Sequence, residues 1–90
     1  MEMARGAQTD VMSRLKRIEG QVRGLQRMIE ERRDCSEVMT QLAAARHALD
    51  RVGFVILSRR LEECARKRAE KTGDAEASMD EAMRLFMTLA

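Results

Sequence analysis

The sequence predicts an all-α protein, a single domain over residues 1–90 built from three helices. Its 90 residues include no proline and only two aromatic residues, and helix-forming residues dominate. In two long segments, apolar residues recur at alternating spacings of three and four, as they do along the buried face of a helix. Two short segments without this pattern, "EERRDCSE" and "KTGD", separate the three helices.

The first helix is predicted to begin at Thr9 or Asp10, since either side chain can cap a helix N-terminus. Residues 1–9 are then expected to form a disordered arm. The apolar face of this helix consists of Val11, Leu15, Ile18, Val22, Leu25 and Ile29.

The second helix is expected to open at Asp34, because Asp34 followed by Glu37 resembles a relaxed capping box. It can run to about Lys71, a length of roughly 35 residues or ~50 Å. Gly53, inside it, permits the close approach of a neighbouring backbone. Its apolar face consists of Cys35, Val38, Leu42, Ala45, Leu49, Val52 and Ile56.

A short third helix is predicted from about Ala75 to Thr88. Gly73 can end the second helix, and Asp74 can cap the third. The large apolar residues Met79, Met83, Phe86 and Met87 are expected to face inward.

Composition narrows the function classes. The net charge is only +2, so any nucleic-acid binding must come from local clusters of basic residues. No apolar run is long enough to span a membrane, and the N-terminus lacks an apolar signal core, so a cytoplasmic protein is expected. Two cysteines in such a protein favour metal binding or redox chemistry over a structural disulfide. A small core also favours an oligomer.

Cys35 and Cys64 lie on the same predicted helix, 29 residues and therefore ~43 Å apart, so they cannot meet within one chain. Both thiols point to nearly the same face of the helix. An antiparallel partner helix crossing near Leu49 and Asp50 would place Cys35 of one chain opposite Cys64 of the other. Two buried structural cysteines are the simpler alternative, which suits Cys35 on the apolar face better than Cys64 among charged residues.

Arg60 lies one helical turn before Cys64. An arginine has no free lone pair and cannot ligate a metal, but its positive charge favours a thiolate. Cys35 lies at a helix N-terminus, which favours a thiolate in the same way. A thiolate can attack a persulfide or disulfide sulfur, and a second thiol can resolve the adduct. A solvated arginine paired with Glu62 or Glu63 is the alternative for Arg60.

The segment "RLKRIEGQVRGLQRMIEERRDCSEVMTQLAAARHALDRV", followed by "LEEC", resembles the copper-sensitive operon repressor family (CsoR/RcnR type) of bacterial regulators. The resemblance covers the chain from Met12 to about Phe86. It implies a non-enzymatic transcriptional repressor that binds operator DNA. It also implies a three-helix subunit, a dimer through antiparallel second helices, and a disc-shaped tetramer built from two dimers.

Copper(I) sensors of this family combine two cysteines with a histidine at the position of Arg60. The chain is therefore similar to the persulfide-sensing (CstR-like) branch, which keeps both cysteines and lacks that histidine. The resemblance implies that Cys35 and Cys64 sense reactive sulfur species, that Arg60 and Glu81 form the thiol environment, and that no cofactor is needed. A Cu(I)-responsive repressor that uses the same two cysteines, with Met39 as a further thioether ligand, is the alternative. Asp34 also departs from the copper sensors, which often carry tyrosine there.

Basic residues on the first two helices are the candidate DNA contacts. A mixed charged face is usually only a solvated surface, but the resemblance places DNA-contacting arginines at Arg14 and Arg51. Arg17 and Lys16 are weaker candidates. The single histidine, His47, is expected to be a surface or interface residue.

Two other classes compete with a repressor. A thiol peroxidase is disfavoured because the sequence shows neither a CxxC motif nor a polar catalytic cluster. A purely structural helical bundle leaves Cys64 and the basic residues unexplained.

Overall fold

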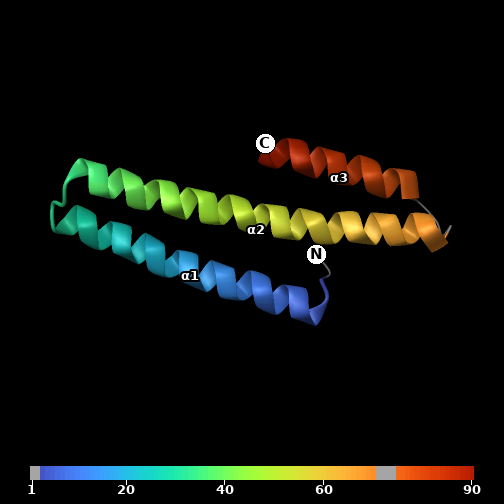
Figure 1. The fold of residues 1–90 in the computed structure, drawn as a ribbon, viewed down its shortest axis with the longest axis horizontal. Helices are drawn as coiled ribbons and strands as arrows, with labels where there is room; N and C mark the ends of the chain where they lie inside the picture. Colours follow the sequence, from blue (N-terminus) through green and yellow to red (C-terminus); the bar gives the residue numbers. More distant parts are fainter. Residues whose placement is uncertain (1–2, 71–74) are drawn as a thin grey trace. The chain divides into compact units, whose positions relative to one another are not determined.

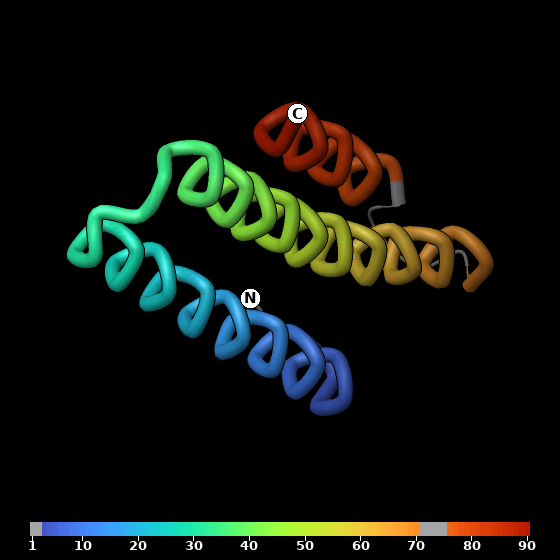
Figure 2. The backbone as a smooth tube through the Cα atoms, turned by 60° about the vertical axis from the view of Figure 1, so that its left-hand side comes forward, coloured from blue at the N-terminus to red at the C-terminus, as the bar shows by residue number. Residues whose placement is uncertain are grey.

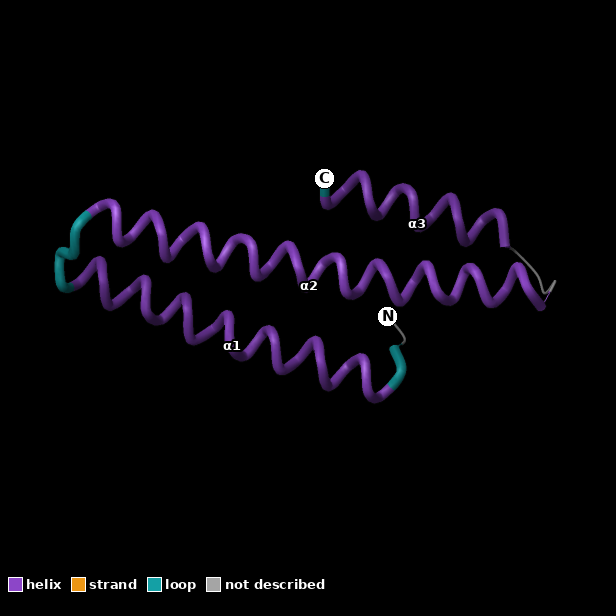
Figure 3. Tube along the Cα trace, viewed as in Figure 1, coloured by secondary structure: helices purple, strands orange, loops and turns teal. Residues whose placement is uncertain are grey.

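The computed structural model describes residues 3–70 and 75–90, and this part of the chain is helical with short connections. The helices are α1 (Arg5–Glu30), α2 (Cys35–Glu70) and α3 (Ala75–Leu89), as drawn in Figures 1 and 3. The predicted three-helix, all-α subunit is therefore confirmed. The chain forms two compact units, residues up to Val52 and residues from Gly53 onward. No helix in the described part is long and apolar enough to cross a membrane.

In the first unit, α1 and the beginning of α2 run in opposite directions, and Figure 2 shows the tight turn that joins them. The apolar face predicted for α1 is buried at Val11 and Ile18, together with Ala7. On α2, Ala45 and Val52 are buried. The alternating spacing is therefore confirmed at these positions, whereas Val22 and Ile29 of the face predicted for α1 and Leu42 and Leu49 of the face predicted for α2 are exposed in the single chain.

The start of α1 differs from the prediction. The helix begins at Arg5, so the expected disordered arm is wrong for residues 5–9. Thr9 is an interior residue whose hydroxyl donates to the Arg5 carbonyl oxygen at 3.0 Å. Asp10 does not cap the helix but pairs with Arg14. The physical reason is Ala7, which is buried and extends the packed face by one turn beyond the predicted cap.

A Schellman motif ends α1. The Arg33 N–H donates to the Met28 carbonyl at 2.9 Å, and the Arg32 N–H donates to the Ile29 carbonyl at 3.2 Å. Arg32 has a φ of 54°, the left-handed conformation that glycine usually supplies at this position. A side chain with a Cβ therefore occupies a strained turn here.

The second helix begins at Cys35, directly after Asp34 as predicted, but without the predicted capping-box pairing. The Asp34 carbonyl accepts from the backbone N–H groups of Glu37 and Val38, at 3.0 and 3.1 Å. The Asp34 carboxylate accepts instead from the Ser36 hydroxyl. Glu37 pairs with Arg33, whose Nε lies 2.8 Å from its carboxylate. The helix extends to Glu70, in agreement with the predicted length, and the predicted caps Gly73 and Asp74 lie outside the described residues.

In the second unit, α3 packs on the last part of α2 through small side chains. Ser78 and Ala82 are buried, with 4% and 1% exposure, whereas Met83 and Met87 are exposed. A Cβ added to Gly53 would lie 2.9 Å from both methyl carbons of Leu89, so α3 approaches α2 closely at its C-terminal end.

The predicted inward face of α3 is therefore wrong for Met83, Phe86 and Met87, and only Met79 is partly covered. The close approach of the two helices selects small residues for the contact and leaves the large ones outside. Large apolar side chains are exposed on all three helices of the single subunit: Met12, Val22, Ile29, Met39, Leu42, Leu49, Phe54, Leu61, Met83, Leu85, Phe86 and Met87.

Candidate functional site

Cys35 is the first residue of α2 and belongs to the first unit. Its thiol is free and exposed. It directly follows the turn that joins α1 to α2. This exposure contrasts with the expectation that Cys35 is the more buried of the two cysteines, and it makes the Cys35 sulfur accessible to a small molecule in the single subunit.

Cys64 is also a free thiol, but it is buried at 1% exposure. Its sulfur lies 2.9 Å from the Ser78 hydroxyl oxygen, within hydrogen-bond distance. The expectation that Cys64 is a poor candidate for burial is therefore wrong, because α3 supplies a small polar partner at this point. Sequence reasoning missed Ser78; the only hint was that Ser78 and Ala82, two small residues, share one face of α3.

Arg60 and Glu81, the predicted thiol environment, contact each other directly. An Arg60 Nη2 lies 2.7 Å from the Glu81 carboxylate, and its Nη1 lies 3.0 Å from Glu63. The hydrogen bond to Glu81 is the main reason that the pKa of Arg60 is raised. Burial acts to raise the pKa of Glu63, but the charges of Arg60 and Lys67 outweigh it and lower that pKa.

Two carboxylates share the Arg60 guanidinium, so its positive charge is largely matched by theirs. The Arg60 Nε is buried and has no hydrogen-bond partner in the described residues. Arg60 remains a residue that cannot act as a metal ligand, and it is now fixed in place by two acidic side chains.

Within the described residues, no group of three or more histidine, cysteine, aspartate or glutamate side chains gathers as a metal site would require. Cys35 belongs to the first unit and Cys64 to the second. The predicted pairing of these thiols across two subunits draws on a second chain and stays a prediction.

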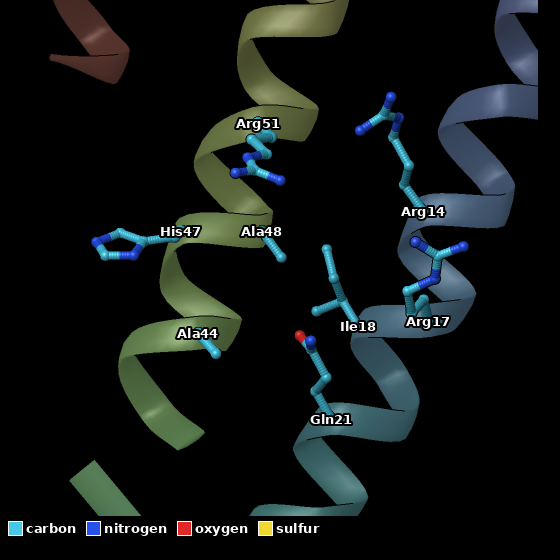
Figure 4. Close-up of a pocket in the computed structure, with 8 residues that line it drawn as sticks. All are labelled: Arg14, Arg17, Ile18, Gln21, Ala44, His47, Ala48 and Arg51. Atoms are coloured by element: carbon cyan, nitrogen blue, oxygen red, sulfur yellow. The ribbon is translucent and has the colours of Figure 1, made fainter. Parts of the chain in front are cut away.

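The candidate DNA contacts Arg14, Arg17 and Arg51 lie around one hollow of the first unit, with a volume of about 350 Å³. Figure 4 shows Ile18 and Gln21 pointing from α1 towards α2. Arg14, Arg17, Ile18 and Gln21 of α1 and Ala44, His47, Ala48 and Arg51 of α2 line the hollow. Lys16 is exposed on α1 and does not line it.

The arginines at this hollow are not all equally available. The Arg14 Nε lies 3.3 Å from both carboxylate oxygens of Asp10. No ion pair is found for Arg17 or Arg51 among the described residues. Three guanidinium groups around one concavity suit the phosphate groups of a nucleic acid, which arginine binds through paired N–H donors.

The sequence matches a family model described as "Metal-sensitive transcriptional repressor" over residues 7–88. The chain belongs to this family. The sequence resemblance to the CsoR/RcnR-type repressors is thereby confirmed, and members of this repressor family are transcription regulators rather than enzymes.

Three relatives place the chain among the metal-sensitive repressors. The copper-sensing transcriptional repressor CsoR of Bacillus subtilis (strain 168) is 38% identical over 76 residues, which cover 84% of this chain and 74% of that protein. The solved structure of the nickel-responsive transcriptional regulator InrS has a TM-score of 0.82 and 38% identity, covering 91% of each chain. The copper-sensing repressor CsoR with Cu(I) from Geobacillus thermodenitrificans NG80-2 has a TM-score of 0.82 and 35% identity, covering 98% of this chain and 91% of that one.

Proposed function

We propose that this chain is a cytoplasmic transcriptional repressor that binds operator DNA and is released by an effector acting on Cys35 and Cys64. The family match supports the repressor function.

For the assembly, we propose a homotetramer built from two dimers, each joined through antiparallel α2 helices. The large apolar side chains exposed on all three helices support an oligomer, because a stable soluble monomer rarely exposes so much apolar surface. Light scattering at micromolar concentration should give the mass of four chains, and a well-folded monomer would contradict the shared site.

The proposed DNA contacts are the arginines of the basic hollow, Arg14, Arg17 and Arg51, with Lys16 as a further phosphate contact. Their grouping around one concavity supports this assignment. Each lost phosphate contact should reduce the slope of log affinity against log salt by about 0.9. Fluorescence anisotropy with DNA from upstream of the gene that encodes this chain measures the slope for Arg14→Ala and Arg51→Ala.

Arg23→Ala is the matched control for these variants. Arg23 carries the same charge on α1, is paired with Glu19 and does not line the hollow. Its loss should leave the salt slope close to that of the unchanged protein. If Arg23→Ala reduces the slope as much as Arg14→Ala and Arg51→Ala do, the DNA site is elsewhere.

For the effector, we propose a reactive sulfur species, a persulfide or polysulfide. The observation that carries this choice is Arg60, because the guanidinium stands one turn before Cys64 and is held there by Glu81 and Glu63. The position at which the copper sensors of the family carry a nitrogen ligand is thus filled by a cation without a free lone pair. Two thiols suffice for sulfur exchange, and no cofactor is required.

The proposed reaction begins at the exposed Cys35. Its thiolate attacks the outer sulfur of a hydropersulfide RSSH, which forms a Cys35 persulfide and releases RSH after protonation. The Cys64 thiolate of the facing subunit then attacks the inner sulfur, forming an intersubunit disulfide and releasing hydrogen sulfide. In sum, two thiols and one RSSH give one disulfide, RSH and H₂S. A second RSSH is needed for a bridge with one extra sulfur.

Cu(I) is the second candidate effector, and the relatives favour it. Those identified above are named as copper-sensing or nickel-responsive regulators. In this chain the Cys35 and Cys64 thiolates would hold Cu(I), which prefers soft sulfur ligands. Met39, one turn after Cys35 and 56% exposed, could add a thioether. Arg60 occupies the position of the third ligand, the histidine of the copper sensors, and cannot replace it. A Cu(I) site in this chain would therefore lack the nitrogen ligand.

One set of experiments separates the two effectors. Persulfide treatment should produce a covalent dimer on non-reducing gels only when both cysteines are present, and should release operator DNA. Cys64→Ala should accumulate the unresolved Cys35 adduct, and Cys35→Ala should stay on DNA. Should Cu(I) instead bind tightly in a competition titration and release the DNA, while persulfide leaves the complex intact, the metal-sensing function is the correct one.

A further inference from the structure

The buried thiol of Cys64 is covered by α3, and three contacts fasten this helix to α2. The Cys64 sulfur meets the Ser78 hydroxyl at 2.9 Å, near the beginning of α3. Arg60 meets Glu81 at 2.7 Å, one turn later. At the last helical residue of α3, Leu89 packs closely against Gly53, where an added Cβ would lie 2.9 Å from both Leu89 methyl carbons. These contacts span α3 from its fourth residue to its end.

We propose that Ser78 is a positioning residue that holds Cys64 in a closed state beneath α3, and that Cys64 reacts only after α3 has moved away from α2. Cys64 and Ser78 have 1% and 4% exposure, so neither group has room for a water partner in this state. Each therefore satisfies the hydrogen-bonding capacity of the other, and breaking the contact without exposure to water would leave two buried polar groups unpaired.

Geometry gives the reason that α3 must move. Exchange at a sulfur atom requires the attacking thiolate to approach that atom directly. With 1% of the residue exposed, no reagent reaches the Cys64 sulfur while Ser78 lies against it. Cys35, by contrast, is exposed in the same chain. The two thiols thus differ in access, and Cys35 reacts first.

The consequence for regulation rests on the proposed function. An effector that engages Cys64 must displace Ser78, so its binding energy is partly spent on releasing α3. The position of α3 then reports whether the Cys64 site is engaged. The effector need not contact α3 itself, because the effector and Ser78 compete for the same Cys64 thiol.

The test uses the full chain with Cys35→Ala, which leaves Cys64 as the single thiol. N-ethylmaleimide labelling is followed by intact mass spectrometry, in buffer and in urea as the unprotected reference. We expect Cys64 to label much more slowly in buffer than in urea. Adding Ser78→Ala should speed labelling by about fivefold, the factor that corresponds to a hydrogen bond of about 1 kcal/mol. Equal labelling rates in buffer and in urea would overturn the closed state.

Two further variants separate the hydroxyl from the helix. Thr88→Ala removes an exposed α3 hydroxyl that donates to the Arg84 carbonyl oxygen, and it should leave the labelling rate unchanged. Leu89→Ala loosens the far end of α3 without touching Cys64, and it should also speed labelling. If Ser78→Ala has no effect, Ser78 is not the positioning residue, and if Leu89→Ala has none, α3 does not need to move.

Protection by a partner subunit is a separate outcome. Labelling that becomes faster on dilution of the protein would assign the protection to another chain and overturn the proposal. Circular dichroism establishes that each variant keeps its helices. None of these measurements involves DNA or an effector. The closed state of Cys64 can therefore be tested even if the chain is not a repressor, and disproof of the closed state would not affect the proposal of DNA binding.

Discussion

Replacing Asp10 by asparagine should strengthen DNA binding, although it adds no contact to DNA. Asp10 holds Arg14 at the basic hollow through two Nε–oxygen distances of 3.3 Å. The Arg14 Nε must leave this carboxylate before it can donate to a phosphate. Asp10→Asn removes the negative charge and nearly preserves the shape of the side chain, so Arg14 is held less strongly with little change in packing.

The size of the effect follows from the exposure of the pair. The Arg14 and Asp10 side chains are 40% and 43% exposed, so solvent screens their attraction. Exposed ion pairs contribute about 0.2–1 kcal/mol, which corresponds to a DNA affinity about 1.4-fold to fivefold higher when the competing carboxylate is removed. The salt slope should stay unchanged, because the same arginine neutralises the same phosphate in both proteins.

Fluorescence anisotropy at several salt concentrations measures both quantities, with Glu19→Gln as the matched control. Glu19 pairs with Arg23 on the same helix, at 3.7 Å and with 66% of its side chain exposed, and this pair does not line the hollow. Both variants remove one negative charge, so they differ only in which arginine is released. Equal gains in affinity from the two variants would show that overall charge acts rather than Arg14, and no gain from Asp10→Asn would remove Arg14 from the DNA site.

Three other predictions follow from the ends of the helices and from the ion pairs near Cys64. Arg32→Gly should raise the free energy of unfolding by about 1 kcal/mol, measured by urea denaturation at fixed protein concentration, because glycine adopts the positive φ of 54° without strain. Arg60→His should strengthen Cu(I) binding at least about tenfold in a competition titration, since it replaces a cation with a nitrogen donor; unchanged affinity would show that this position is not near the metal. Glu63 has a lowered pKa in the folded chain, so its contribution to stability is present above its usual value of 4.5 and is lost as the pH falls through the lower folded value. Glu63→Gln should therefore lower stability at neutral pH and flatten its decline below about pH 4.5, as followed by acid titration of the helical circular dichroism signal; an unaltered pH profile would contradict the ion-pair role.

Much of the fold could be predicted from local patterns. The apolar spacing located the faces that bury Val11, Ile18 and Val52, because this periodicity reports a helix face directly. The start of α1 was missed because a good N-cap residue, Thr9, also fits a helix interior, where its hydroxyl bonds to Arg5. Caps mark where a helix can begin, whereas burial of Ala7 determined where it does begin.

The candidate site was predicted less completely. The pairing of Arg60 with Glu81 joins residues 21 positions apart, and only the family resemblance suggested it. Ser78 was missed because a serine in a helix carries no distinctive pattern, and its role depends on how closely α3 approaches α2. Cys35 was predicted to be the more buried cysteine, whereas Cys64 is the buried one. The neighbouring residues in the sequence do not reveal which side chains a third helix covers.

The methionines that stand on the outside of the helices affect how sulfur chemistry on this chain is measured. Met12, Met39, Met83 and Met87 are 47%, 56%, 55% and 69% exposed. Exposed thioethers are readily oxidised to sulfoxides. Two oxygen atoms have nearly the mass of one sulfur atom, so a chain with two methionine sulfoxides resembles a chain with one persulfide at low mass resolution. Fragment spectra that place the added mass on Cys35 or on a methionine are therefore needed to determine whether the thiols of this protein are modified.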